Sequence, residues 1–272
     1  MNSTDPAVFA RRAGRAEDGS LVDITLTSTT ASGADLADMV AELEQRWPPR
    51  GLERARITDW TEVRLRIDID GSGAVRVDGA DGGGGWDRVE SAIGLFAAEH
   101  LTARVAVHAA VLVTDHGAIV LPGATHTGKS TLARAARQRG LLVLGDEYAL
   151  VDSASGAVQG WPRPLRTRRP SHVERTPLDE AEQVSAFTDH SVALVAVLTY
   201  SPASPSIRPV SRVDMVIEVL RNTVCARVRP EASVSAAMAM TSNALLVVGT
   251  RGESDATIDV LLEQLERQRP PA

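Results

Sequence analysis

The chain has 272 residues, of which 43% are hydrophobic and 24% are charged. This length and apolar fraction suffice for one large domain or two smaller ones, which excludes a disordered or fibrous protein. The net charge of −6 argues against a nucleic-acid partner. The single cysteine, Cys225, excludes an intramolecular disulfide and a cysteine-based zinc site. No apolar run resembles a membrane span or a secretory signal, so we expect a soluble, cytoplasmic protein with no membrane partner.

The N-terminal part of the chain is predicted to form a small region of its own. The first twenty residues show no periodicity and are expected to be a loose lead. Residues 21–100 are expected to form a small α+β region, because strand and helix patterns alternate there. In chain order these patterns predict a strand at 21–27, a helix at 35–46, strands at 61–69 and 74–77, and a helix at 86–101.

From residue 101 to 268 the sequence changes to short apolar runs separated by turns. In chain order it predicts strands at 104–113 and 118–121, a helix at 129–139, a strand at 141–144, a hairpin of 148–151 with 157–161, central strands at 192–199 and 244–248, and helices at 211–221 and 254–267. The order strand, loop, helix, strand is the unit that builds a phosphate site in an α/β sheet. We therefore predict an α/β P-loop domain.

The sequence GATHTGKS, residues 123–130 and hereafter the glycine loop, fits the pattern G-x-x-x-x-G-K-[ST] between a predicted strand and helix. In such a loop the backbone N–H groups and the helix N-terminus bind phosphates, the lysine contacts the β and γ phosphates, and the serine contacts magnesium. Lys129 is the only lysine beside 28 arginines, which indicates that this position excludes arginine. ATP and Mg²⁺ are thus the expected cofactors, with ATP held by Gly123, Ala124, Thr125, His126, Thr127, Gly128, Lys129, Ser130 and Thr131.

Further candidate residues flank the loop in sequence. Asp146 and Glu147 follow a predicted strand and are expected beside the loop, where one acid can hold magnesium while its neighbour deprotonates a hydroxyl. His108, on an apolar strand face, is either a core histidine or a site residue. The basic stretch 161–170, which includes Arg166, either contacts a transferring phosphoryl group, binds an acidic substrate, or is a solvated loop. The polar residues that follow it, up to Asp189, are predicted to form a mobile lid over the acceptor.

These residues resemble the catalytic domain of the HPr kinase/phosphorylase family, bacterial kinases that phosphorylate a serine of the phosphocarrier protein HPr. The resemblance runs from VHAAVLV through LPGATHTGKSTLARAARQRG to LLVLGDE and WPRPLR, and is strongest to the short HPr-kinase-like proteins of peptide-modification gene clusters. It implies that Asp146 is the catalytic base, that Glu147 with Ser130 holds magnesium, and that His108 supports the base. Thr131 stands where that family has glutamate, and the phosphorylase signature is absent. Phosphorolysis is therefore not carried over, and HPr is not the expected acceptor.

The sequence thus predicts an ATP- and Mg²⁺-dependent kinase whose catalytic residues are Asp146, His108, Lys129 and Arg166. The expected acceptor is a serine or threonine of a peptide or small protein. A small-molecule hydroxyl kinase and a nucleotide sensor without turnover stay open, although a sensor has no need of the acid pair. A common GTPase is excluded because its N-K-x-D motif needs a second lysine. A homo-oligomer is also expected as an option, with the helix at 254–265 either at its interface or in the core.

Overall fold

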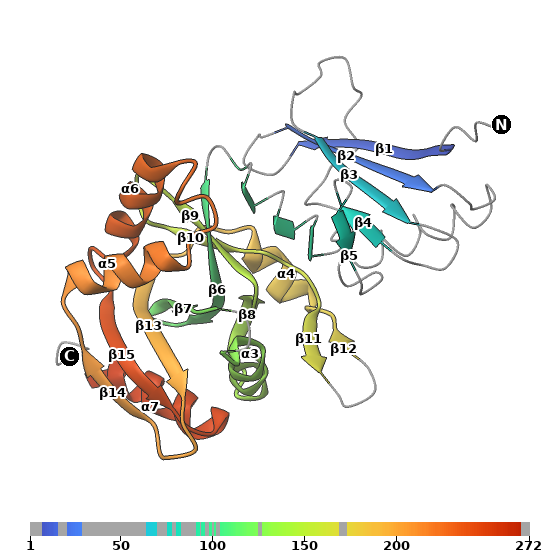
Figure 1. The fold of residues 1–272 in the computed structure, drawn as a ribbon. Coiled ribbons are helices and arrows are strands. Elements are labelled where there is room, and N and C mark those ends of the chain that lie inside the picture. Colours follow the sequence, from blue (N-terminus) through green and yellow to red (C-terminus); the bar gives the residue numbers. More distant parts are fainter. Residues whose placement is uncertain are drawn as a thin grey trace. The chain divides into compact units, whose positions relative to one another are not determined.

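The computed structural model describes residues 7–15, 21–28, 64–69, 75–77, 80–82, 91–92, 94–95, 98–99, 101, 104–124, 127–168 and 173–267. The chain divides into two compact units, Met1–Ala103 and Arg104–Ala272. Figure 1 labels the strands and helices of both units. The helix predicted at 35–46, and the loop residues Thr125 and His126, lie outside the described residues.

The N-terminal unit contains a five-stranded sheet, with the strands in chain order. Its strands are β1 Ala7–Arg15, β2 Leu21–Ser28, β3 Arg64–Ile69, β4 Val75–Val77 and β5 Ala80–Gly82. The predicted strands at 21–27, 61–69 and 74–77 are confirmed, and the described residues between 91 and 99 are helical. The expectation of a loose lead is wrong for residues 7–15, because β1 pairs antiparallel with β2 over its whole length. Backbone pairing forms this strand without side-chain alternation.

The C-terminal unit is a mixed α/β fold around one large sheet, in the order β10-β9-β6-β7-β13-β15-β14, with β8 also paired to β6. The strands of this sheet and the helices that cover it are β6 Arg104–Thr114, β7 Gly117–Pro122, α3 Lys129–Gln138, β8 Leu142–Gly145, β9 Tyr148–Asp152, β10 Val158–Gly160, β13 Val192–Tyr200, β14 Ser206–Pro209, α5 Arg212–Arg221, α6 Pro230–Met240, β15 Leu245–Arg251 and α7 Ser254–Arg267. Every strand and helix predicted in this unit is confirmed, whereas two of these elements, β14 and α6, were not predicted. The fold class is therefore α/β in this unit.

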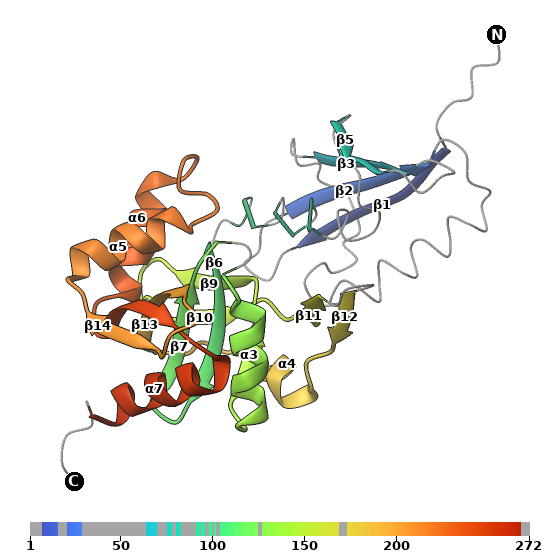
Figure 2. The ribbon, with the colours of Figure 1, turned by 60° about the horizontal axis from the view of Figure 1, so that its bottom comes forward.

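The sheet is covered on both faces by helices, as Figures 1 and 2 show. Alternating residues of β6 face opposite sides, so Val107 and Ala109 belong to one hydrophobic cluster and Ala110 and Leu112 to another. Helices α5 and α6 close the first cluster with Met215, Val219, Ala237 and Met240. Helices α3 and α7 close the second with Leu132, Ala136, Ile258 and Leu261. The apolar side of α7 is thus part of the core.

Strand directions bring four strand ends to one edge of the sheet. Strand β6 is antiparallel to both β7 and β8, which therefore run parallel to each other on its two sides. Strand β13 is parallel to β7, and β15 is parallel to β13. The carboxyl ends of β8, β7, β13 and β15 consequently lie at the same edge, which is where ligands bind in open α/β sheets.

The segment after the hairpin β9–β10 is more ordered than the sequence predicts. Strands β11 Leu165–Arg168 and β12 Val173–Thr176 pair antiparallel, and helix α4 Glu180–Ala186 follows. Leu165 is fully buried in the cluster beneath α3, which anchors the hairpin to the core. Asp179 and Glu182 form a capping box at the start of α4. The predicted irregular stretch is therefore wrong for residues 165–168, because one buried leucine and strand pairing stabilise regular structure there. The mobile lid over the acceptor stays a prediction.

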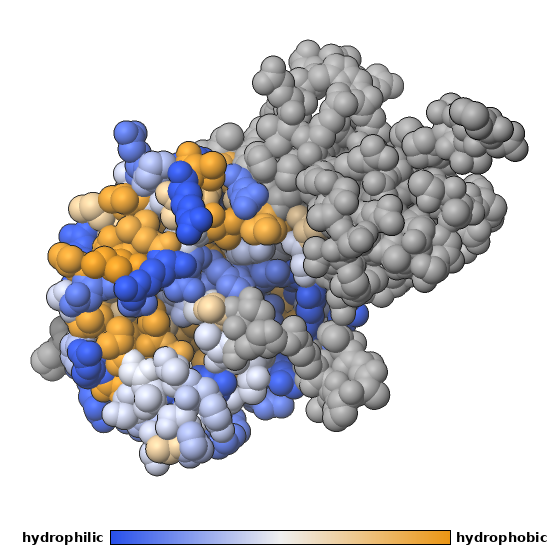
Figure 3. All heavy atoms as spheres, viewed as in Figure 1, coloured by the Kyte–Doolittle hydropathy of each residue, from blue (hydrophilic) through white to orange (hydrophobic). Residues whose placement is uncertain are grey.

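Apolar side chains also gather on the outer faces of α5 and α6 (Figure 3). Val213 and Ile217 of α5 lie one turn apart and are exposed, as are Val234 and Met238 of α6. Within the described part of the chain, no helix combines the length and the apolar character needed to cross a membrane.

Candidate functional site

The predicted site residues lie at the shared carboxyl edge of the parallel strands. The glycine loop follows β7, Asp146 and Glu147 follow β8, and Tyr200 and Arg251 are the last residues of β13 and β15. Elements separated by more than a hundred residues in sequence therefore contribute to one place in the fold.

The glycine loop is held by backbone contacts from both sides. The N–H of Gly123 donates to the carbonyl oxygen of His108 at 3.1 Å. Gly128 has a φ of 87°, a left-handed conformation that glycine adopts without steric cost. Its carbonyl oxygen accepts from the N–H groups of Thr131 and Leu132 and so begins α3. Among the described residues no side chain caps this helix, whose N-cap is Gly128, as in a helix N-terminus that binds an anion.

Lys129 turns its side chain back over the loop. Its Nζ donates to the carbonyl oxygens of Gly123 at 2.7 Å and Ala124 at 2.9 Å, and the residue is buried. Burial lowers the pKa of the ammonium to about 8, against the opposing effect of the nearby Asp146 carboxylate. The chain's only lysine thus stays mostly charged at neutral pH but titrates far below an ordinary lysine.

Asp146 joins the loop to the strand edge. Its carboxylate accepts a hydrogen bond from the Ser130 hydroxyl, and it is buried. Burial raises its pKa, while the Ser130 hydrogen bond and the positive charges of Lys129 and Arg166 oppose that rise. Four of the predicted site residues therefore interact here. Such a combination of burial and specific charge partners is typical of functional sites.

Glu147 is engaged differently from its neighbour. Its carboxylate forms an ion pair with Arg163, whose guanidinium is almost fully buried. The preceding Gly145 lies so close to the carbonyl oxygen of Trp161 that a Cβ there would approach it to 2.6 Å. The segment that carries Arg163 therefore packs directly against the end of β8. Arg163 is in consequence a partner of Glu147 rather than an exposed cation of the basic stretch.

His108 is close to the site but does not contact Asp146. Its imidazole lies 5.9 Å from the ring of Tyr148, and its backbone N–H donates to Asn222 O at 2.7 Å. Burial, followed by the charge of Lys129, lowers its pKa to about 4, so the ring is neutral at neutral pH. Among the residues that the structure describes, no hydrogen bond joins His108 to Asp146.

Arg251 is a site residue that the sequence analysis missed. Its Nε donates to the carbonyl oxygen of Thr127 at 2.9 Å, and its guanidinium lies 4.8 Å above the ring of Tyr200. The residue is buried. The predicted strand stopped at residue 248, so this arginine fell outside it. A prediction that extended the strand to residue 251 would have placed Arg251 at its carboxyl end, where ligands bind in α/β sheets.

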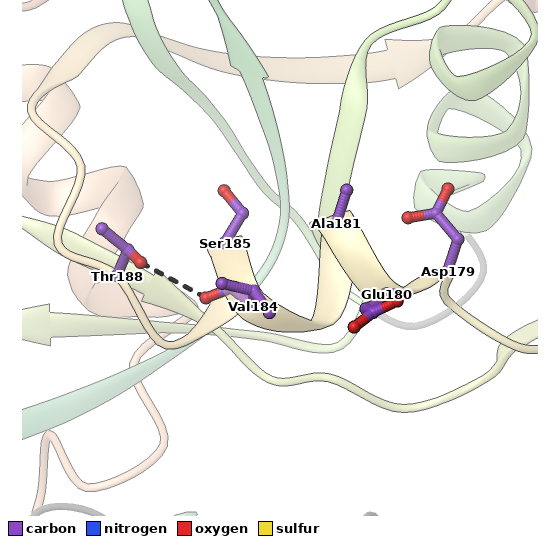
Figure 4. Close-up of a pocket in the computed structure, with 6 residues that line it drawn as sticks. All are labelled: Asp179, Glu180, Ala181, Val184, Ser185 and Thr188. Atoms are coloured by element: carbon purple, nitrogen blue, oxygen red, sulfur yellow. Dashed lines mark hydrogen bonds between the residues drawn. The ribbon is translucent and has the colours of Figure 1, made fainter.

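A second concave surface lies away from the strand edge. A shallow depression on α4 is lined by Asp179, Glu180, Ala181, Val184, Ser185 and Thr188, where the Thr188 hydroxyl donates to the Val184 carbonyl oxygen (Figure 4). None of these belongs to the strand edge. The described residues also contain no cluster of three or more histidine, cysteine, aspartate or glutamate side chains fit for a metal. The Asp146 carboxylate and the Ser130 hydroxyl are nevertheless hard oxygen donors of the kind that Mg²⁺ accepts beside substrate phosphates.

Comparison with known proteins adds little to these contacts. No protein-family model matches the sequence, and no curated protein matches it. Among solved structures, the chain is similar to the Hpr(Ser) kinase/phosphatase from Coxiella burnetii, with 14% identity and a TM-score of 0.32 over 60% of this chain and 93% of that chain. A likeness with this TM-score says nothing about the chemistry of the site.

Proposed function

We propose that this chain is an ATP- and magnesium-dependent phosphotransferase, which transfers the γ-phosphoryl group to a hydroxyl. The observation that carries the proposal is the meeting of Lys129, Ser130 and Asp146 where the glycine loop opens α3. A buried ammonium beside uncapped helix N–H groups favours a polyanion. The Ser130 hydroxyl and the two carboxylates that follow β8 offer oxygen ligands to a hard cation that binds together with that polyanion.

In the proposed site, backbone N–H groups of the glycine loop and of the first turn of α3 bind the phosphate oxygens. Lys129 leaves the carbonyl oxygens of Gly123 and Ala124 and donates to the phosphates, which are charged and hence stronger acceptors. Ser130 and one of the two acids hold magnesium. The bound ion supplies charge neutralisation on the phosphates.

The two acids have separable roles in this proposal. Asp146 is the proposed base, because a raised pKa suits a group that accepts a proton from the acceptor hydroxyl. Glu147 is the proposed magnesium ligand and has to leave Arg163 to act as one. Titrating Mg²⁺ into the ATP-bound variants Asp146→Asn and Glu147→Gln tests this division. If only Asp146→Asn weakened magnesium binding, Asp146 would be the magnesium ligand and Glu147 the base.

The acceptor is proposed to be a serine or threonine of a peptide or small protein. Arg166 supports this choice: it lies near Asp146, in a short hairpin that is anchored by the buried Leu165, so a bound segment would meet positive charge beside the base. A small-molecule hydroxyl is the second candidate. His108 stays the proposed supporting residue of the base: its neutral imidazole lies near enough to Lys129 for that charge to lower its pKa.

Phosphoryl transfer is tested with γ-labelled ATP, using peptides encoded beside the gene and then a cell extract as acceptors. Mass spectrometry locates the label. We expect it on a serine or threonine, and a decrease on the order of a hundredfold in Asp146→Asn with ATP still bound. Label on a free metabolite alone would identify a small-molecule kinase. ATP binding without transfer to any acceptor would identify a sensor.

A cytoplasmic location and a homo-oligomer remain part of the proposal. Cell fractionation and light scattering measure them, and a strict monomer would remove the oligomer.

A further inference from the structure

Arg251 meets the glycine loop from a strand that is remote in sequence. It is the last residue of β15 and is the register partner of Tyr200, the last residue of β13. The Tyr200 ring lies beneath the guanidinium, and the Nε donates to the carbonyl oxygen of Thr127. A further donor, Nη1, reaches the carbonyl oxygen of Gly252 at 3.4 Å. The arginine is thus fixed on its own side by the two strand ends while it contacts the loop.

The bonded carbonyl belongs to the peptide unit that joins Thr127 to Gly128. A peptide unit is planar and trans, so its C=O and N–H point in opposite directions; the structure contains no cis peptide bond among its described residues. When Arg251 holds the carbonyl oxygen of Thr127, the N–H of Gly128 must point away from Arg251. One hydrogen bond therefore sets the direction of a loop donor on the other side of the chain.

The same arginine also accounts for the glycine at position 128. A Cβ built on Gly128 would lie 1.8 Å from Nη2 of Arg251, and the φ of 87° is itself unfavourable for other residues. The guanidinium thus fills the space that a side chain would occupy. The loop backbone and Arg251 fit together only when residue 128 has no side chain.

We propose that Arg251 is a positioning residue that orients the N–H of Gly128 toward a bound phosphate by holding the opposite end of the same peptide unit. The identity of that ligand, a nucleoside triphosphate, rests on the proposed function. The orienting contact itself does not, because it exists in the protein without a ligand. Arg251 acts through the backbone and is not assigned contact with the reacting atoms.

The test compares Arg251→Gln with the wild type by two measurements. Calorimetry with Mg-ATP is expected to show affinity reduced on the order of tenfold, the scale of a lost hydrogen bond that involves a charged group. Hydrogen exchange of the nucleotide-free protein is expected to be faster in the peptide covering the glycine loop, with the strands of the sheet unchanged. Arg139→Gln is the matched control, since Arg139 pairs with Asp255 and Asp259 at the far end of α3. It should leave both measurements unchanged.

A second variant keeps the test decisive if Arg251→Gln folds poorly. Tyr200→Leu leaves the arginine but removes the ring beneath it, and Tyr200 is half exposed, so the change is tolerable for folding. Tyr200→Leu should lower ATP affinity and speed hydrogen exchange of the glycine loop, each by less than Arg251→Gln does. Unchanged loop exchange in both variants would overturn the inference, as would a loss of protection spread over the whole unit. If the wild type binds no ATP, the proposed function fails while the exchange measurement still decides the role of Arg251.

Discussion

Raising the pH should weaken ATP binding through one identifiable group. Lys129 is buried, and its pKa is lowered to about 8, mainly by that burial. The charged ammonium is the form that binds phosphate strongly. ATP affinity is therefore highest well below pH 8 and falls as the pH rises through that value. With a pKa of 8, the charged fraction falls from about nine tenths at pH 7 to about one tenth at pH 9. The dissociation constant should therefore rise about tenfold, or about 1.4 kcal/mol.

Calorimetry at pH 7, 8 and 9 measures this change, and repeating it in buffers of different ionisation enthalpy counts the protons taken up. We expect uptake of about half a proton at pH 8, because bound phosphates keep the lysine charged. The interpretation is clean because the chain has no second lysine and its single cysteine is buried. Lys129→Met is the matched control: its side chain carries no titrating group, so its weaker residual affinity should not change between pH 7 and pH 9. A flat affinity in the wild type, or an equal decrease in Lys129→Met, would refute the reasoning.

Three further changes test individual contacts. Gly128→Ala should displace Arg251 and strain the left-handed residue, lowering ATP affinity at least tenfold by calorimetry; unchanged affinity contradicts that packing. Glu147→Ala should lower the free energy of unfolding on the order of 3 kcal/mol in urea titrations, because the buried Arg163 loses its anionic partner; no loss would mean that the pair is weak. His108→Gln should remove about 2 to 3 kcal/mol of the wild type's stability loss between pH 6.5 and pH 4, because in that window His108 is protonated in the unfolded chain while its folded pKa of about 4 keeps it neutral in the folded protein. Identical pH profiles would refute it.

The C-terminal unit was predictable where the local sequence pattern and the tertiary packing favour the same element. The apolar runs of β6, β7 and β13 indicate buried strands, and Gly140, with a φ of 79°, follows the end of α3, where glycine commonly ends a helix. Where local signals were weak, prediction failed. Helix α6 has alanine, serine and methionine around its circumference and no clear polar face, and β1 depends on pairing with β2 rather than on alternation. The hairpin β11–β12 is anchored by the buried residue Leu165, which a basic, proline-containing sequence conceals.

The site divides in the same way. The glycine loop could be predicted because its function requires a contiguous pattern of glycines, lysine and serine. The partners of Asp146 and Glu147 could not, because the choice between Ser130 and Arg163 depends on how two loops pack after β8. Arg251 was equally invisible, since a contact over more than a hundred residues arises only when β15 is laid parallel beside β13.

Mg-ATP calorimetry on Lys129→Ala tests the central claim most directly. The proposal is that a triphosphate binds at the glycine loop, and Lys129 is the side chain expected to exchange its hydrogen bonds with two loop carbonyl oxygens for bonds to phosphate. Removing it should weaken binding on the order of tenfold to a hundredfold, the range for hydrogen bonds to charged groups. Arg139→Gln, at the other end of the same helix, should bind like the wild type. A dissociation constant for Lys129→Ala equal to that of the wild type would contradict the account.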